Sequence, residues 1–218
     1  MARAVFLDYN GTLIRRKGKD IEEFYNRILQ NSRMKDVDAL TDWWLTNRGI
    51  LETGCTAEAF LSQEEICMSL LRKMEKDYGL RENQDDLRQL MMNHWMYAPI
   101  FSDVREFFEQ CSLPVYIVTN INEQYVRVCL RRNDLHVNGV ISGETAKAYK
   151  PDSRLFEKAL AISECASEDA VFIGSSLQAD ISGAEAAGMR PVLLNRNRKP
   201  VECTCKVVYK LPEAIRFL

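Results

Sequence analysis

The chain has 218 residues, and its 29 basic and 31 acidic side chains give a formal net charge of −2 at pH 7. This length can hold one ordinary domain, or a core with a smaller appendage. Because the charges balance and no long run of one sign occurs, the sequence argues against nucleic acid or an anionic membrane surface as the main partner. No apolar stretch approaches the roughly 20 residues that span a bilayer.

The cysteines and the N-terminal residues indicate the compartment. Seven cysteines are scattered along the chain; only Cys203 and Cys205 lie close together, and no second Cys or His pair completes a zinc site. The first residues lead into an apolar segment without a secretory leader. We therefore predict a cytoplasmic protein with reduced thiols, whose oligomeric state is left open.

The first predicted element is a short buried strand over residues 4–7, which ends at Asp8. The basic cluster Arg15-Arg16-Lys17 that follows is interpreted as a solvated loop. Between about residues 20 and 95 no strand pattern occurs, and apolar residues recur with helical spacing near 21–29, 37–45, 63–78 and 87–95. Four amphipathic helices of this kind can form a small bundle.

After Pro99 helices and strands alternate. Helices are predicted over 104–111, 123–132, 153–162 and 179–187, and strands over 115–118, 140–141, 171–173 and 192–194, with an edge strand at 207–208 and a terminal helix opened by Pro212. This alternation predicts an α/β fold with a parallel sheet that is covered on both faces. The predicted domains are a core over residues 1–16 and 98–218 and an all-helical insertion over 17–97, with a hinge near 15–18 and 97–99.

Four polar residues stand at predicted strand ends or at the start of a helix: Asp8, Thr119, Lys150 and Asp180. Each has a structural interpretation when taken alone, as a turn residue, a surface cation or a stabiliser of a helix N-terminus. Together they fall where an open α/β sheet binds its ligand. A carboxylate there can be a nucleophile, a metal ligand or both, and a hydroxyl and an ammonium group can hold an anion. The sequence therefore predicts a site where a carboxylate attacks an anionic group.

The motifs around these residues resemble the signatures of the haloacid dehalogenase-like hydrolase superfamily, from residue 8 to about residue 195. The matching segments are Asp8-Tyr9-Asn10-Gly11-Thr12-Leu13, Thr119-Asn120, Lys150-Pro151 and Gly174 to Asp180. The resemblance implies a Rossmann-like core with a helical cap of the C1 type inserted after the first motif. It also implies a hydrolase acting on a small anionic substrate that the cap selects.

The resemblance implies roles for individual residues. Asp8 would be the nucleophile that forms an aspartyl ester or an aspartyl phosphate. Thr119 and Lys150 would hold the transferring group and offset its charge. The other residues expected to bind the substrate are Gly11, Asn120 and Ser175.

The resemblance also implies a Mg²⁺ ion bound by Asp8, by the backbone carbonyl of Asn10 and by Asp180. Two residues depart from the phosphatase pattern: Asn10 stands where those enzymes have their acid/base, and Ser175 stands where they have a metal-binding aspartate. An amide does not transfer protons near neutral pH, and loss of a general acid costs ~10²–10⁴ in rate. A hydroxyl in place of a carboxylate weakens the binding of a hard cation.

Three functions remain open on the sequence alone. The first, favoured by its prevalence in the superfamily, is a phosphatase acting on a small phosphorylated metabolite, slowly or with a leaving group that needs no proton. The second is 2-haloacid dehalogenase-type hydrolysis, which needs neither a metal nor a general acid; Ser175-Ser176 with Asp180 resembles the fourth motif of those enzymes, although Leu177 replaces an asparagine and no cap arginine is matched. The third is a catalytically weakened protein that binds anions.

Overall fold

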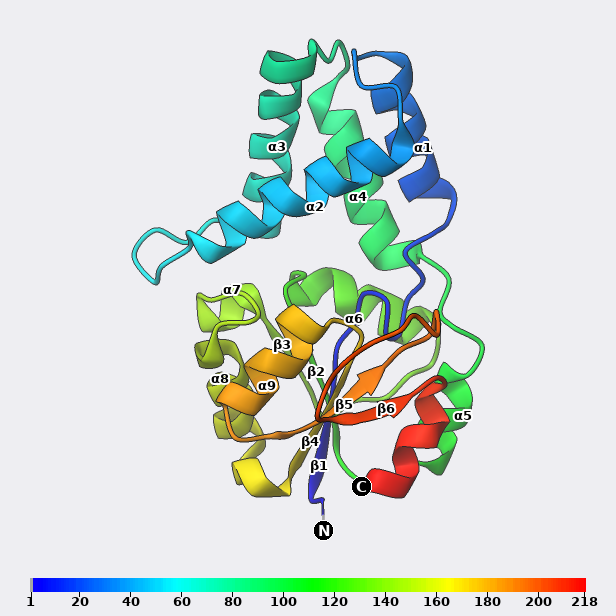
Figure 1. The fold of residues 1–218 in the computed structure, drawn as a ribbon, viewed down its shortest axis with the longest axis vertical. Coiled ribbons are helices and arrows are strands. Elements are labelled where there is room, and N and C mark those ends of the chain that lie inside the picture. The colour runs from blue at the N-terminus through cyan, green and yellow to red at the C-terminus, as the bar shows by residue number, and fades with distance from the viewer. Residues whose placement is uncertain (1) are drawn as a thin grey trace.

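The computed structural model describes residues 2–218 and has two parts, a core built on a sheet and a helical cap above it (Figure 1). Within these residues the sheet contains six strands: β1 Ala4–Leu7, β2 Val115–Thr119, β3 Gly139–Ser142, β4 Ala170–Gly174, β5 Arg190–Leu194 and β6 Lys206–Val208. Their spatial order is β3-β2-β1-β4-β5-β6, and every neighbouring pair is parallel. The predicted α/β fold with a parallel sheet is confirmed.

β1 lies inside the sheet, at the point where the chain connections run off in opposite directions. Val5 pairs with Val115 of β2 on one side and with Val171 of β4 on the other. The residues that follow these three strands therefore meet at one edge of the sheet. That edge is where open α/β folds bind their ligands, and Asp8 lies there directly after β1.

The side chains of β1 alternate between two hydrophobic layers. Ala4 and Phe6 pack in one cluster with Phe156, and Val5 and Leu7 belong to a larger cluster on the other face. Because both faces are covered by helices, the strand is apolar throughout. The helices of the core are α5 Val104–Gln110, α6 Glu123–Arg132, α7 Gly143–Ala146, α8 Ser153–Ser163, η1 Ser167–Asp169, η2 Leu177–Ile181, α9 Ser182–Ala186 and η3 Leu211–Phe217.

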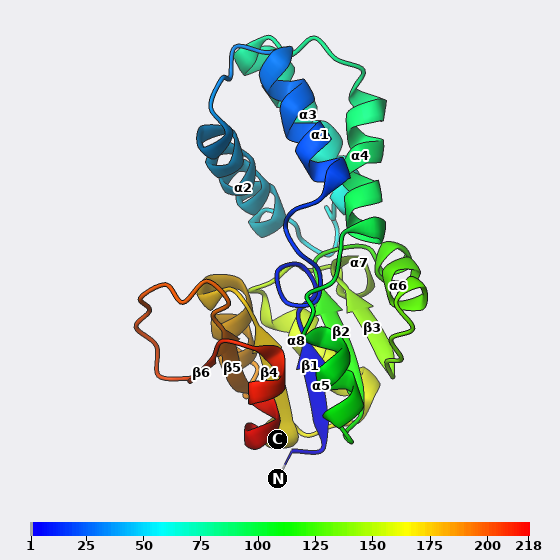
Figure 2. The ribbon, with the colours of Figure 1, turned by 90° about the vertical axis from the view of Figure 1, so that its right-hand side faces the viewer.

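Between β1 and α5 the described residues contain four helices, which form the cap (Figures 1 and 2): α1 Lys19–Gln30, α2 Val37–Thr53, α3 Gln63–Tyr78 and α4 Gln84–Tyr97. Side-chain caps fix where these helices begin. Asp36 accepts a hydrogen bond from the backbone N–H of Ala39 at 2.6 Å, and Ser62 and Glu65 form a reciprocal capping box. The predicted helical insertion after the first strand is confirmed.

Cap and core are joined by two neighbouring chain segments and touch again on the far side. The backbone N–H of Arg15 donates to the carbonyl of Pro99 at 2.9 Å, so the two predicted hinge segments are bonded to each other. Elsewhere the hydroxyl of Tyr149 in the core donates to the carbonyl of Leu61 in the cap at 2.8 Å. A hinge motion about the two segments stays a prediction.

Three elements differ from the sequence-based expectation. α2 continues to Thr53, although a helix was predicted only as far as about residue 45. Its second half exposes apolar residues such as Ile50, so it lacks the amphipathic period on which the prediction depended. The helix expected over 179–187 is divided into the π-helical turn η2 and the short helix α9, and the C-terminal helix η3 is a 3₁₀ helix. Among residues 2–218, no helix combines the length and the apolar character needed to cross a bilayer.

Candidate active site

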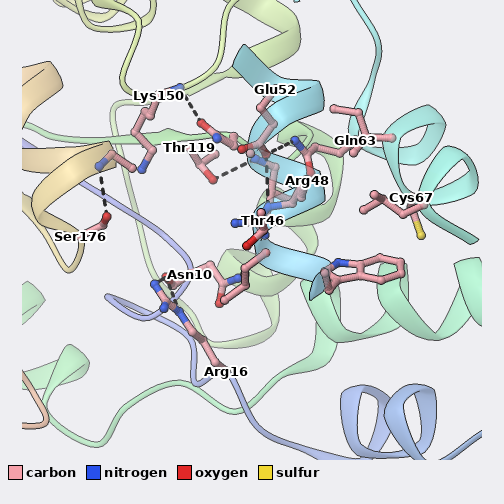
Figure 3. Close-up of a pocket in the computed structure, with 18 of the residues that line it drawn as sticks. Asn10, Arg16, Thr46, Arg48, Glu52, Gln63, Cys67, Thr119, Lys150 and Ser176 are labelled. Atoms are coloured by element: carbon pink, nitrogen blue, oxygen red, sulfur yellow. Dashed lines mark hydrogen bonds and ion pairs between the residues drawn. The ribbon is translucent and has the colours of Figure 1, made fainter. Parts of the chain in front are cut away.

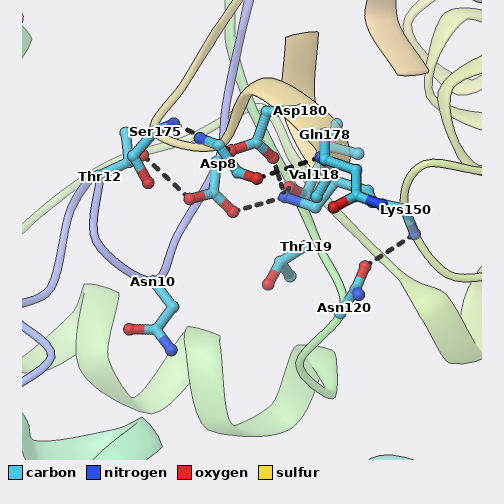
Figure 4. Close-up of polar contacts among 12 residues, drawn as sticks. Asp8, Asn10, Thr12, Val118, Thr119, Asn120, Lys150, Ser175, Gln178 and Asp180 are labelled. Atoms are coloured by element: carbon cyan, nitrogen blue, oxygen red, sulfur yellow. Dashed lines mark hydrogen bonds and ion pairs between the residues drawn. The ribbon is translucent and has the colours of Figure 1, made fainter. Parts of the chain in front are cut away.

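Asp8, the predicted nucleophile, follows β1 and lines a cavity between the core and the cap. The residue is 6% exposed. Its Oδ2 accepts a hydrogen bond from the hydroxyl of Thr12 at 2.9 Å, and its Oδ1 accepts one from Nζ of Lys150 at 2.5 Å (Figure 4). Because both oxygens are held, the carboxylate is oriented before any substrate arrives, as a nucleophile requires.

Lys150 supplies the buried positive charge of the site. Its Nζ lies 2.5 Å from Asp8 Oδ1 and 2.6 Å from Asp180 Oδ1, between the two carboxylates (Figure 4). Its backbone N–H donates to the side-chain oxygen of Asn120 at 2.9 Å. Burial alone would lower the pKa of this ammonium group, but the charges of Asp180 and Asp8 outweigh it, so the pKa is raised. Lys150 therefore remains a cation at the carboxyl edge of the sheet.

Asp180 is the second buried carboxylate of the cluster. Its Oδ2 accepts hydrogen bonds from the backbone N–H groups of Ser175 and Ser176, both at 2.9 Å. Gly174 allows this close approach, because a Cβ there would lie 2.4 Å from the Cβ of Asp180. Burial raises the pKa of Asp180, and the charge of Asp8 raises it further while Lys150 opposes the rise. A carboxylate with a raised pKa beside the nucleophile can take a proton from water.

Thr119 and Asn120, at the end of β2, also line the cavity. Thr119 is buried, and its Oγ1 accepts a hydrogen bond from the backbone N–H of Ile121 at 3.1 Å. The hydroxyl proton of Thr119 is therefore left for a substrate anion. Asn120 has a second task, because its side-chain oxygen holds the backbone of Lys150.

Asn10 lies apart from the buried ion pairs, with its amide group on the side of the cavity (Figure 4). Its side-chain oxygen is buried and has no hydrogen-bond partner among residues 2–218. Its backbone carbonyl accepts from Nη2 and Nε of Arg16 at 3.1 and 3.3 Å, and the same Nη2 lies 3.4 Å from Ser175 Oγ. Arg16 thus joins the two positions that depart from the phosphatase pattern. Gly11, with φ +95°, lies under its guanidinium group.

The site opens into a cavity of about 1160 Å³. On the cap side its wall is largely apolar, with the side chains of Ile21, Trp44, Ile66, Leu70, Met91 and Trp95. A concave, largely apolar wall facing a few polar groups is typical of a site for a small molecule. The prediction of a small anionic substrate thus has a cavity to receive it.

Among the polar side chains that the cap places in the cavity wall, three interact with one another (Figure 3): Arg48 and Glu52 of α2 and Gln63 of α3. Oε1 of Glu52 accepts a hydrogen bond from Nε2 of Gln63 at 2.7 Å and lies 3.5 Å from Nε of Arg48. These three residues were not predicted as part of the site, because the helix was expected to end near residue 45. The spacing of four between Arg48 and Glu52 was the available signal, since such residues share one helix face.

The predicted magnesium ligands are all engaged by other groups. Asp8 and Asp180 share the ammonium of Lys150, and the carbonyl of Asn10 accepts from Arg16. Within residues 2–218, no group of three His, Cys, Asp or Glu side chains is placed to hold a metal ion. A hard divalent cation prefers several free oxygen ligands, so this donor set, as arranged, does not fit one.

A buried carboxylate, a hydroxyl and a lysine at the carboxyl edge of a parallel sheet, beneath a helical cap, define a capped α/β hydrolase. The family model of the haloacid dehalogenase-like hydrolases matches residues 2–188. The chain belongs to this family, and the resemblance seen in the motifs is confirmed.

Similar proteins differ in the substrates that their names state. The phosphoserine phosphatase of Thermus thermophilus is 43% identical over 135 residues, which are 58% of this chain and 53% of that protein. The chain thus spans about half the length of this relative. The L-2-haloacid dehalogenase of Xanthobacter autotrophicus superposes with a TM-score of 0.78 at 15% identity, over 100% of this chain and 98% of that one. The hydrolase YfnB of Bacillus subtilis, solved bound to magnesium, has a TM-score of 0.78 at 19% identity, with 99% and 98% covered. At these identities the two structures establish the fold alone.

Proposed function

We propose that this protein hydrolyses a small anionic molecule through an ester on Asp8, and that the leaving group departs as an anion without a proton. One observation carries the proposal: the buried contact of 2.5 Å between Asp8 Oδ1 and Lys150 Nζ at the cavity. It holds a carboxylate nucleophile beside a fixed cation. Among the substrate classes that the names of similar proteins state, the 2-haloacids match this chemistry.

In the first step, one carboxylate oxygen of Asp8 attacks the carbon that bears the halogen. A carbon–oxygen bond forms, the carbon–halogen bond breaks, and the halide leaves with the electron pair. The hydroxyl of Thr119 holds the carboxylate of the substrate, and the charge of Lys150, whose ammonium group stays between Asp8 and Asp180, offsets the substrate charge.

In the second step, water attacks the carbonyl carbon of the ester while Asp180 takes a proton from that water. Asp180 returns the proton to the departing hydroxy acid. The carboxyl group of Asp8, which now contains one oxygen from water, loses its remaining proton to solvent. The raised pKa of Asp180 suits it to this transfer.

Asn10 favours this reaction over the hydrolysis of ordinary phosphate esters, which the sequence alone ranked first. The amide of Asn10 cannot protonate a leaving alkoxide, and that step is worth ~10²–10⁴ in rate. A halide needs no proton. The engagement of all three predicted magnesium ligands supports the same choice, because halide displacement needs no metal.

A phosphatase acting on activated phosphates is the second candidate. The similarity to the phosphoserine phosphatase of Thermus thermophilus favours it, as do the cations Lys150 and Arg16 on the core side of the cavity. An acyl phosphate releases a carboxylate, which needs no proton, so Asn10 is no obstacle to that reaction.

The test compares 2-chloropropionate, acetyl phosphate and an alkyl phosphate, each with Mg²⁺ or with a chelator, and measures chloride and phosphate release. We expect chloride release that the chelator leaves unchanged and that Asp8→Asn abolishes. A single turnover in ¹⁸O-water should leave the label in the peptide that contains Asp8. Phosphate release without chloride release would establish the second candidate, and phosphate binding without any turnover would identify a weakened anion-binding protein.

A further inference from the structure

Arg16 connects the loop after β1 with the loop after β4, because its Nη2 lies near the backbone carbonyl of Asn10 and the hydroxyl of Ser175; Figure 3 shows Arg16 beside Asn10. We infer that its guanidinium group is a built-in cation of the active site, which takes the place of a divalent metal ion and binds the anionic part of the substrate. The claim that Arg16 binds the substrate rests on the proposed function. The claim that Arg16 takes the place of a metal ion concerns the protein without substrate.

The contacts of Arg16 are with the positions that a metal ion would use. Its Nη2 and Nε approach the backbone carbonyl of Asn10 at 3.1 and 3.3 Å, and that carbonyl is a predicted metal ligand. Its Nη2 also lies 3.4 Å from the hydroxyl of Ser175, which replaces a metal-binding aspartate. A guanidinium group is a permanent cation with only hydrogen-bond donors. It therefore complements a carbonyl and a hydroxyl that lack the negative charge to hold Mg²⁺.

The loop after β1 is shaped around this guanidinium group. Gly11 has φ +95°, a conformation that side chains other than glycine rarely adopt. A Cβ at Gly11 would lie 2.7 Å from Nε and 2.8 Å from Nη2 of Arg16. The guanidinium group thus packs against the backbone of the loop, which leaves its far edge toward the cavity that it lines.

The charges of the site are consistent with Arg16 in place of a divalent metal ion. Carboxylates at positions 10 and 175 together with a divalent ion would add no net charge to the site. The neutral side chains of Asn10 and Ser175 together with Arg16 add one positive charge. Lys150, Asp8 and Asp180 together carry a charge of −1, and Arg16 brings the sum to zero, so an anion meets no net repulsion even without a metal ion.

The first measurement is the melting temperature with and without MgCl₂, which needs no turnover. We expect no Mg²⁺-dependent shift for the wild-type protein. The triple variant Asn10→Asp, Ser175→Asp, Arg16→Ala should gain a shift, because it restores the carboxylates and removes the competing cation. A shift in the wild-type protein that disappears in Asp8→Asn would overturn the inference, whatever the substrate proves to be.

The second measurement is the affinity for inorganic phosphate as an anionic probe. Loss of a charge-assisted hydrogen bond should weaken binding about 10- to 100-fold in Arg16→Gln. Arg15→Gln is the matched control, because Arg15 lies on the same loop with its guanidinium group over the ring of Phe101, 4.8 Å from the centroid. Since Arg16 is exposed, both variants should fold. Equal phosphate affinity in the two variants would show that Arg16 does not bind the anion. Neither outcome depends on the haloacid assay, so the proposed function and this inference can fail separately.

Discussion

Asp8 and Lys150 are 142 positions apart in the sequence, yet their charged atoms approach to 2.5 Å in the buried edge of the sheet. The same ammonium group lies 2.6 Å from Asp180. One cation therefore serves two buried carboxylates, and the stability of the core is tied to the chemistry of the site.

We predict that Lys150→Met destabilises the protein by about 3–5 kcal/mol, because it leaves two buried carboxylates without their cation. Urea unfolding near neutral pH measures this change. The deficit should shrink as the pH falls, because burial raises the pKa of Asp180 and its protonation in the folded state removes a charge that has lost its cation. Lys158→Met, at an exposed position of α8, is the control and should cost little. A deficit that did not change with pH would argue against unpaired carboxylates as its cause.

His94 of α4 should make the protein less stable in mild acid. It is 3% exposed, and burial lowers its pKa from 6.5 to about 4. Above pH 6.5 both the folded and the unfolded states are neutral at this residue. Between about pH 6.5 and pH 4 the unfolded chain takes up a proton that the folded state does not, so stability falls as the pH falls, by up to about 3 kcal/mol.

Unfolding free energies measured across this pH range test the prediction for His94. His94→Gln should flatten the dependence. His136→Gln should leave it unchanged, because the side chain of His136 is 90% exposed. The same pH slope in the wild type and in His94→Gln would assign the acid sensitivity to other groups.

Asn10→Asp should introduce a general acid where the chain now has an amide. We expect a larger gain for an alkyl phosphate, whose alkoxide must be protonated, than for an aryl phosphate, whose phenolate leaves unaided. The ratio of the gain for the alkyl phosphate to the gain for the aryl phosphate should approach the ~10²–10⁴ in rate that a general acid contributes. Steady-state rates for both substrates give this ratio, and Asn10→Ala serves as the comparison. Equal gains for the two substrates would show that the missing acid does not limit the rate.

The central part of the site could be predicted because Asp8 and Thr119 each mark the end of a strand. Asp8 and Thr119 follow apolar runs that pair in register, Leu7 with Ile117, so the residues after them must lie close together. A parallel sheet with its first strand inside brings such ends to one edge whatever the details of packing. Lys150 and Asp180 lie instead before α8 and within η2, and they were found through their motifs.

Arg16 and Arg48 could not be predicted in this way. Each is a long side chain whose direction is set by contacts with other parts of the fold. The cluster around Arg16 was interpreted as a solvated loop, and it is exposed, yet its guanidinium group is directed at the carbonyl of Asn10. Arg48 lies in the half of α2 whose apolar period is weak, so the sequence did not reveal that this turn of the helix faces the cavity.

Arg48 and Glu52 should have opposite effects on anion binding. Glu52 is 8% exposed and lies 3.5 Å from Nε of Arg48, so its charge partly cancels that of the guanidinium group at the cavity wall. Glu52→Gln keeps the shape and the hydrogen-bonding capacity toward Gln63 but removes this charge, and we expect tighter phosphate binding, by roughly 3- to 10-fold. Arg48→Gln should weaken binding by a similar factor. Titration calorimetry with phosphate measures both, and Glu58→Gln, in the exposed loop after α2, is the control. Changes of the same sign in the two variants would mean that the pair acts through the packing of the cap, since only an electrostatic role requires the signs to differ.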